Sequence, residues 1–449
     1  MTRRTCQAII LAAGQGTRMK SDKPKVLHEV AGLSMVGHVT KAASKSGVDL
    51  ISVVVGPDMD AVHREANNAH PTVNAHVQTE RLGTAHAVLA ARPDLIEAKD
   101  DVLVLFGDTP LLTSETLLSV REKLAKSNDV VVLGFRPAVP DPYGRLIEKN
   151  GKLVAIREAK DCTSEELAIT FCNGGIMGFS GKHVLELLDA IEDTNAQKEF
   201  YLTDAVEKAN EKGLMVTALE ADEEELQGVN TRQHLANVEA SFQVRARLEA
   251  MANGATLIAP ETVFFSYDTK LGKDVVIEPN VIFAPGVTIA DNVTIRAFSH
   301  LESATVAEGC VIGPYARLRP GTELEKGAKI GNFVELKKTR VEKGAKVNHL
   351  SYIGDARVGE KANIGAGTIT CNYDGFDKFK TDIGKGAFIG SNTALVAPAT
   401  IGDGAFIGAG SVITGPVAAD DLAFTRAPVI VKSGWAASFR AKKAQKSKK

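Results

Sequence analysis

The chain has 449 residues, more than one ordinary hydrophobic core accommodates, so two domains are expected. Hydrophobic residues make up 44% and charged residues 24%, and a net charge of −2 gives no whole-chain signal for nucleic-acid or membrane binding. No apolar run reaches the roughly 18 residues of a membrane span, and no signal-like segment opens the sequence, so we expect a cytoplasmic protein without a transmembrane segment. Five scattered cysteines without C-x-x-C spacing argue against a disulfide framework and a zinc site.

The first 230 residues alternate short aliphatic runs with amphipathic stretches. Four runs are predicted to be buried strands: 8–11, 50–55, 102–106 and 130–133. This alternation is typical of an α/β, Rossmann-like domain with a largely parallel sheet, which we assign to residues 1–230. A helical pattern then starts at Thr231 and stops at Asn253-Gly254, which predicts a linker helix over residues 231–253.

The remaining residues, 254–449, follow a different period. An aliphatic or aromatic residue recurs every six positions at Leu271, Ile277, Phe283, Ile289, Ile295 and Leu301. Steps of five shift the register at Val306, Val341 and Val358, and the series runs on to Ile413. A coil of three short strands keeps such a period, whereas a helix or a plain alternating strand does not. The pattern predicts a parallel β-helix of hexapeptide repeats, and it leaves the handedness of that helix open.

The last ten residues, 440–449, contain six Lys or Arg and no acid. A solvated, mobile tail is the favoured interpretation, and a binding segment is the alternative.

A glycine-rich turn follows the first predicted strand, in the motif from Leu11 to Met19. Glycine lets the backbone approach a phosphate group, and Arg18 and Lys25 can neutralise a triphosphate. The motif therefore favours a nucleotide site over a turn that only connects two elements. Asp108 stands at the end of the 102–106 strand, where open α/β sheets bind ligands, and is a candidate Mg²⁺ ligand; a helix-capping role is the alternative.

Polar residues interrupt the repeats at two places. Arg319, Lys337 and Tyr352 are spaced to stack on successive coils, where they can surround an anion such as a sugar phosphate. An insertion over 370–382 carries further polar residues and is expected to project over a binding face. His349 is the natural general base for acyl transfer, with Glu335 and Tyr352 as neighbours; a solvated surface histidine is the alternative.

These motifs resemble a known family of sugar nucleotidyltransferases, the bifunctional N-acetylglucosamine-1-phosphate uridylyltransferases / glucosamine-1-phosphate acetyltransferases, over nearly the whole chain. In the first half the resemblance rests on 11–19, Lys25, 78–80, 82–84, 106–108, 143–145, 173–175, 201–204 and 228–230. In the second half it rests on 316–321, 332–338, 349–355, 363–375 and 425–428. One departure is Pro142, where the family has glycine, in the loop before Tyr143-Gly144.

The resemblance implies roles for residues of the first half. The nucleotide would be held by Leu11, Ala12, Ala13 and Gly14, with Phe106 and Gly107 beside it, and its uracil would be read by Gln78, Gly83 and Thr84. The phosphates would be faced by two catalytic residues, Arg18 and Lys25, and Mg²⁺ would be shared by Asp108 and Asn230. The sugar would be contacted by Gly144, Glu158, Asn173 and Thr203. The residues themselves do not separate UTP from dTTP.

The resemblance also implies roles for the second half. The catalytic base would be His349. Glucosamine 1-phosphate would be bound by Arg319, Lys337, Tyr352, Asn363 and Lys378. Acetyl-CoA would be contacted by Ala366, Asn372, Tyr373, Ser391, Ala409 and Arg426. The family's β-helix is left-handed and trimeric, with each acetyltransferase site shared between chains. The expected product, UDP-N-acetylglucosamine, feeds peptidoglycan and lipopolysaccharide precursors.

Two other hypotheses stay open. The chain can be a nucleotidyltransferase whose β-helix is only a trimerising or regulatory scaffold. It can also be a non-enzymatic metabolite sensor in which both sites are vestigial. Polar residues kept together inside the repeats, such as His349, Asn372 and Tyr373, favour two activities over a scaffold.

Overall fold

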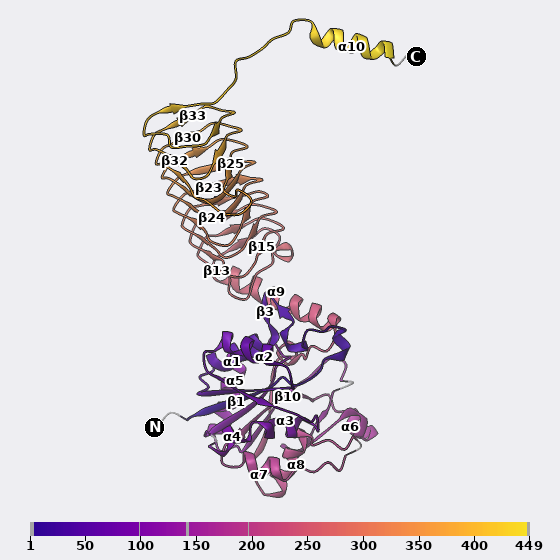
Figure 1. Cartoon of the computed structure of the whole chain (residues 1–449). Helices are drawn as coiled ribbons and strands as arrows, with labels where there is room; N and C mark the ends of the chain where they lie inside the picture. Colours follow the sequence, from indigo (N-terminus) through magenta and orange to yellow (C-terminus); the bar gives the residue numbers. More distant parts are fainter. Residues whose placement is uncertain (1–3, 98, 141–142, 196, 447–449) are drawn as a thin grey trace. The chain divides into compact units, whose positions relative to one another are not determined.

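The computed structural model describes residues 4–97, 99–140, 143–195 and 197–446, so Pro142 lies outside the described residues. The chain divides into two compact units, Met1–Leu248 and Glu249–Lys449, and the division falls inside helix α9 (Arg232–Ala252) (Figure 1). Each unit is described by itself.

The first unit is built on a nine-stranded sheet with the order β11-β7-β10-β6-β1-β4-β5, to which the β8–β9 hairpin adds through β10. The strands are β1 (Cys6–Leu11), β4 (Leu50–Val55), β5 (Val73–Val77), β6 (Asp101–Phe106), β7 (Val130–Phe135), β8 (Arg145–Lys149), β9 (Lys152–Arg157), β10 (Cys172–Ser180) and β11 (Val216–Glu220). The small hairpin β2 (Glu29–Val30) and β3 (Leu33–Ser34) lies outside this sheet. The Rossmann-like α/β prediction is confirmed.

The sheet is mixed rather than largely parallel, because β10 runs antiparallel to both β6 and β7. Strand β10 was not predicted, because its residues CNGGIMGFS include three glycines that weaken a strand pattern. Strands β1, β4, β5 and β6 are parallel to one another, so the residues that follow Leu11, Val77 and Phe106 meet at one edge of the sheet.

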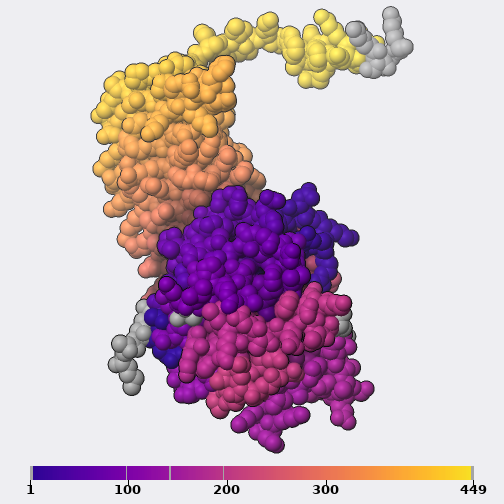
Figure 2. Space-filling view, turned by 60° about the horizontal axis from the view of Figure 1, so that its bottom comes forward, coloured from indigo at the N-terminus to yellow at the C-terminus, as the bar shows by residue number. Residues whose placement is uncertain are grey.

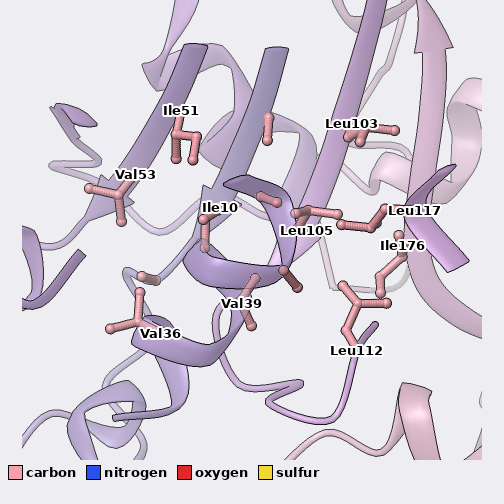
Figure 3. Close-up of a cluster of buried hydrophobic side chains, with 14 of the residues drawn as sticks. Ile10, Val36, Val39, Ile51, Val53, Leu103, Leu105, Leu112, Leu117 and Ile176 are labelled. Carbon is pink, nitrogen blue, oxygen red and sulfur yellow. The ribbon is translucent and has the colours of Figure 1, made fainter. Parts of the chain in front are cut away.

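Two hydrophobic cores lie on the two faces of this sheet, because successive strand residues point to opposite sides. Ile10 belongs to one cluster and Ile9 to the other, and both are fully buried. Figure 3 shows Val36 and Val39 of α1 directed toward Ile10 and its neighbours on the sheet. Truncating such a residue to alanine typically costs about 2–5 kcal/mol.

The helices of this unit are α1 (Met35–Lys45), α2 (Asp60–Ala69), α3 (Thr84–Ala90), α4 (Arg92–Ile96), α5 (Ser114–Ala125), α6 (Ser164–Leu167), α7 (Val184–Asp189), α8 (Ala205–Glu211) and most of α9.

The second unit is a parallel β-helix made of short strands in two long sheets. The ten-stranded sheet contains β12 (Thr256–Leu257), β14 (Val276–Ile277), β17 (Thr294–Ile295), β20 (Val311–Ile312), β23 (Lys329–Asn332), β25 (Lys346–His349), β27 (Asn363–Ile364), β30 (Phe388–Ile389), β33 (Phe406–Ile407) and β35 (Leu422–Ala423). The fourteen-stranded sheet contains β13 (Lys270–Leu271), β15 (Ile282–Phe283), β16 (Thr288–Ile289), β18 (His300–Leu301), β19 (Ala304–Val306), β21 (Arg317–Leu318), β22 (Thr322–Leu324), β24 (Glu335–Val341), β26 (Tyr352–Val358), β28 (Ile369–Cys371), β29 (Thr381–Ile383), β31 (Ala394–Val396), β32 (Ala399–Ile401) and β34 (Val412–Ile413).

The six-residue period has the predicted physical meaning, because the repeating residues fill the axis of the coil. Ile277, Ile295, Leu318 and Ile389 are all fully buried. The insertion forms a tight hairpin, closed by a bridge between Tyr373 and Lys378, whose tip residue Phe376 is 93% exposed.

Near the end of the chain, Trp435–Lys446 forms helix α10, which includes part of the basic segment. Its residues are exposed, as Figure 2 shows in yellow, and Trp435 stacks on Phe439 one turn later. None of the helices in the described part of the chain combines the length and apolar composition that a membrane span requires.

Candidate functional site

A cavity of about 880 Å³ opens at the carboxyl edge of the parallel strands in the first unit. It gathers nearly all the residues singled out in that half of the sequence: Leu11, Ala12, Ala13, Gly14, Arg18, Lys25, Gln78, Gly83, Thr84, Phe106, Asp108, Gly144, Glu158, Asn173, Thr203 and Asn230. Gly107 does not line it; its N–H instead donates to the Leu11 carbonyl and joins β6 to β1 beneath the cavity.

Four charged or amide side chains form one network on the cavity wall. The Lys25 ammonium contacts the Asp108 carboxylate and donates to Asn230 Oδ1 at 3.1 Å, and Arg18 donates to the same oxygen at 3.0 Å. Lys25 and Asp108 are only 13% and 16% exposed, so their charges interact in a partly desolvated setting. The chain thus brings Asn230 to Lys25 from more than 200 positions away.

Asp108 and Asn230 fit a cation site. The Lys25 ammonium binds an oxygen of each, so both oxygens already lie within reach of one positive charge. No cluster of three or more His, Cys, Asp or Glu side chains in the described residues could hold a metal ion, so Mg²⁺ here would complete its shell with phosphate and water oxygens, as it commonly does. The helix-capping alternative for Asp108 is wrong, because the Thr113 side chain caps the following helix, α5.

The loop from Gln78 to Thr84 requires glycine at position 83. Its φ is +115°, and a Cβ there would lie 2.5 Å from the Phe200 carbonyl oxygen and 2.7 Å from the Phe200 nitrogen. Gln78 donates to the Gly83 carbonyl at 3.3 Å, and Thr84 accepts the Leu202 N–H at 2.9 Å. The loop is therefore held by the Gln78 side chain and by the backbone of Phe200 and Leu202.

The same cavity is lined by the residues expected to contact the sugar. Asn173 donates its backbone N–H to the Gly144 carbonyl at 2.8 Å. Burial raises the pKa of the Glu158 carboxyl above its usual range, which suits a group that meets sugar hydroxyls. Lys160 donates to the Tyr201 hydroxyl at 3.2 Å, and both residues line the cavity.

In the β-helix, one corner position recurs in five successive coils. It is occupied by Asn332, His349, Ala366, Ser391 and Ala409, which we call the corner row. Backbone hydrogen bonds of 2.7–3.2 Å join successive coils along this row. In each of the four, the carbonyl of one member accepts the N–H of the residue that follows the next member, as Asn332 accepts from Leu350. Small side chains in the last three positions leave room along the corner, and the row leads to His349.

The immediate partner of His349 is Asn332 rather than Glu335. His349 Nδ1 lies 2.8 Å from Asn332 Oδ1, and that oxygen can only accept, so Nδ1 carries the proton and Nε2 the lone pair. Glu335 accepts a hydrogen bond from Arg319 at 2.8 Å instead. Glu335 lies on the coil before His349, as predicted, where it pairs with Tyr352 across β24 and β26.

Cations gather on the fourteen-stranded sheet beside this corner. Lys378 and then Arg319 lower the pKa of Lys337 below its usual range, because like charges disfavour the protonated amine. The Tyr352 hydroxyl and the Asn372 amide lie over Gly354, where a Cβ would collide with them. An anion bound here would relieve the repulsion, as the sequence pattern indicated.

Two predicted residues lie apart from that cluster. Asn363 belongs to β27 of the ten-stranded sheet, whereas the cations lie on or beside the other sheet. Arg426 lies at the far end of the corner row, with its guanidinium 5.3 Å from the Phe424 ring centre and close to Gly408.

Comparison with known proteins gives the same division of the chain. Residues 8–169 match the model of the MobA-like NTP transferase domain, and residues 268–303 and 380–415 match the bacterial transferase hexapeptide (six repeats). The bifunctional protein GlmU of Azorhizobium caulinodans is 57% identical over 441 residues, 98% of each chain. That of Agrobacterium fabrum is 55% identical over 447 residues, 99% of each chain. The chain belongs to the GlmU family.

As a GlmU family member, the chain is a bifunctional transferase. The GlmU of Chelativorans sp. is 59% identical over 401 residues, 89% of this chain and 88% of the relative. A solved structure, a putative glucose-1-phosphate thymidylyltransferase from Bacillus anthracis in complex with a sucrose, has a TM-score of 0.43 at 19% identity and covers 53% of this chain and 95% of its own.

Sequence reasoning missed three residues of these GlmU sites. Arg81 lines the cavity and donates to the Ala13 carbonyl at 3.2 Å, and Lys160 also lines the cavity. Asn332 orients His349. A signal existed for each: Arg81 lies between Gln78 and Gly83, Lys160 follows Glu158 by two positions, and Asn332 precedes His349 by 17, one coil.

Proposed function

We propose that the β-helix corner acetylates glucosamine 1-phosphate with acetyl-CoA and that the cavity of the first unit then transfers uridylyl from UTP to the N-acetylglucosamine 1-phosphate. The products are UDP-N-acetylglucosamine, for peptidoglycan and lipopolysaccharide precursors, and pyrophosphate. Family membership supports both activities, and a nucleotide-sugar reaction with acetyl-CoA fits the two matched domains. The observation that carries the uridylyl step is the Arg18, Lys25, Asp108 and Asn230 network in the cavity.

In the uridylyl step, a phosphate oxygen of N-acetylglucosamine 1-phosphate attacks the α-phosphorus of UTP, and the bond to pyrophosphate breaks. Such transfers depend on positioning and charge neutralisation rather than on a protein nucleophile. Arg18 and Lys25 stabilise the charge that develops on the phosphates, while the Gln78–Thr84 loop holds the base. Asp108 and Asn230 would hold Mg²⁺, which when bound supplies further charge neutralisation.

In the acetyl step, His349 Nε2 accepts a proton from the sugar amine as the nitrogen attacks the thioester carbonyl. The new C–N bond forms, and the CoA thiolate leaves. Asn332 holds the imidazole in the tautomer that presents this nitrogen. Acetyl-CoA would run along the corner row past Ala366, Ser391 and Ala409 to Arg426, with Asn372 and Tyr373 beside it. Arg319, Lys337, Tyr352, Asn363 and Lys378 would take the sugar phosphate.

The proposal includes a homotrimer through a left-handed β-helix and a cytoplasmic location. Asn363 and the cation cluster occupy different sheets of one chain, so a site shared between chains would unite residues that one chain separates. A stacked row of Phe298, Tyr315 and Phe333, each about half exposed, offers an apolar edge for such contact. Sedimentation velocity of the purified chain tests the trimer.

The test of function is a four-way assay of the purified protein. UTP or dTTP is supplied with glucosamine 1-phosphate or its N-acetylated form, with and without acetyl-CoA. We expect pyrophosphate from UTP with the N-acetylated sugar alone, and from UTP with glucosamine 1-phosphate only when acetyl-CoA is present. Pyrophosphate without any CoA release would favour the scaffold hypothesis for the β-helix.

A further inference from the structure

Arg145 is a large, charged side chain buried in the first unit, although it has no assigned role. It lies at the start of β8 and is 2% exposed. No carboxylate in the described residues forms an ion pair with it. Its guanidinium donates instead to three backbone carbonyls, those of Pro140 at 3.0 Å, Tyr143, and Leu167 at 3.4 Å.

This arrangement costs the fold free energy. A buried guanidinium loses its hydration, and neutral carbonyls compensate less than a carboxylate would. Its Nε is buried without a hydrogen-bond partner. An apolar residue of similar volume would serve packing better, so packing alone does not account for an arginine at this position.

The strand register connects Arg145 to the predicted sugar contacts in the cavity. Arg145 is paired with Arg157 on β9 and with Cys172 on β10. The residue next to each of the three, toward the cavity, is a predicted sugar contact: Gly144, Glu158 and Asn173, respectively. The guanidinium therefore lies directly behind the place where these three strands present the sugar-binding residues.

The three carbonyls belong to segments that carry or adjoin these contacts. Pro140 and Tyr143 flank the loop that leads into Gly144, and Leu167 ends helix α6, which follows the Glu158 loop. A flat guanidinium can reach three carbonyls at once, whereas the single ammonium of lysine cannot do so in a fixed geometry.

We propose that Arg145 is a positioning residue for the sugar phosphate, which ties the Tyr143–Gly144 loop and the end of α6 into the conformation that receives it. The inference rests on the proposed uridylyl transfer and deepens it. Arg145 touches neither UTP nor the reacting phosphorus; it acts through the backbone of its neighbours.

The test is Arg145→Lys, which keeps the positive charge but removes the planar guanidinium that reaches three carbonyls. With N-acetylglucosamine 1-phosphate varied at saturating UTP, we expect KM for the sugar phosphate to rise about ten-fold, the effect of losing one or two charge-assisted hydrogen bonds. KM for UTP should stay within two-fold, because Arg145 donates to Pro140, Tyr143 and Leu167 and not to the Gln78–Thr84 loop. The matched control is Arg92→Lys, which alters an exposed pair with Asp189 and should change neither constant.

Equal rises in both KM values, or no change in either, would show that Arg145 does not position the sugar. Loss of the first unit's thermal transition at the assay temperature would make it a stability residue and would equally overturn the proposal. Failure of the uridylyl proposal itself has a different signature, because the wild-type enzyme would then release no pyrophosphate from UTP and the sugar phosphate.

Discussion

The two candidate sites are built in opposite ways. In the first unit, residues from Leu11 to Asn230 converge from loops spread over the whole domain on one cavity. In the β-helix, the corner row is a single position repeated by the coil, and its neighbours are exposed, as Leu350 at 61% and Tyr373 at 58% show.

This contrast has a physical consequence for each site. A cavity built from distant segments is desolvated, so its charges act strongly but depend on the tertiary fold. In the corner row, the strand register of neighbouring coils determines the position of each residue, and hydrogen bonds between coils hold it there. Substitutions should therefore separate the two activities cleanly.

The largest separation is expected from His349→Ala. Without the imidazole no group accepts the amine proton, so CoA release should fall about 1,000-fold, within the range of general base catalysis. Pyrophosphate release from UTP and N-acetylglucosamine 1-phosphate should stay at the wild-type rate. The control is His300→Ala, an exposed histidine of β18 on the same β-helix, which should leave both rates intact. Equal loss of both activities in His349→Ala would contradict the two-site model.

The converse is Asp108→Ala. Removing this carboxylate takes away a Lys25 partner and a proposed Mg²⁺ ligand, so pyrophosphate release should fall about 100-fold or more. CoA release from acetyl-CoA and glucosamine 1-phosphate should not change. Asp222→Asn, which alters a carboxylate outside the cavity-lining residues, is the control. Normal turnover by the Asp108 variant would show that the metal assignment is wrong.

The sequence predicted most where structure repeats locally. The six-residue period identified the buried positions of the coil, and the glycine turn after β1 identified one wall of the cavity, because both patterns are written in neighbouring residues. Asp108 followed from its place at a strand end. Family resemblance supplied Asn230 and Asn173, which no local pattern indicated.

The rest could not be predicted because it depends on contacts between distant segments. Strand β10 was missed since its glycines weaken the strand pattern and it pairs antiparallel between β6 and β7. The hydrogen bond that Arg319 donates to Glu335 was not predicted, because it joins two successive coils. Asn332 was missed although the step of five at Val341 makes this coil 17 residues long, because its contact with His349 joins two coils.

A smaller effect is expected from Asn332→Leu. The leucine leaves His349 in place but removes the oxygen that fixes its tautomer and ring orientation. Acetyl transfer should slow by roughly ten-fold, with kcat affected more than the KM for either substrate, because a misoriented base costs rate rather than binding. Thr305→Leu, at an exposed strand position of β19, is the control for general damage to the β-helix. An unchanged kcat would show that the imidazole is oriented by another group.

The smallest effect concerns stability and contrasts Asp204, a partly buried acid, with Asp189, an exposed acid that is paired with Arg92. Burial raises the pKa of Asp204, at the start of α8, from 3.8 to about 6, with Glu207 and Glu158 adding to the rise and Arg157 and Lys208 opposing it. The folded state therefore binds this proton more tightly than the unfolded state, and the contribution of Asp204 to stability falls as pH rises from about 4 to 6. Asp204→Asn should gain melting temperature over the wild type across this interval, with no further gain above it.

Asp189 supplies the opposite sign in the same unit. Its hydrogen bonds with Arg92 hold the pKa of this carboxyl below its usual range, so its stabilising effect is present above the unfolded value of 3.8 and is lost as pH falls through the folded pKa. Asp189→Asn should therefore melt earlier than the wild type at neutral pH, and the difference should shrink in acid. Calorimetry of the full chain from pH 7 to below the unfolded Asp value of 3.8 measures both variants. Parallel pH profiles for the two would mean that desolvation of Asp204 does not govern its titration, and the contrast between buried and paired acids would then fail at its clearest example.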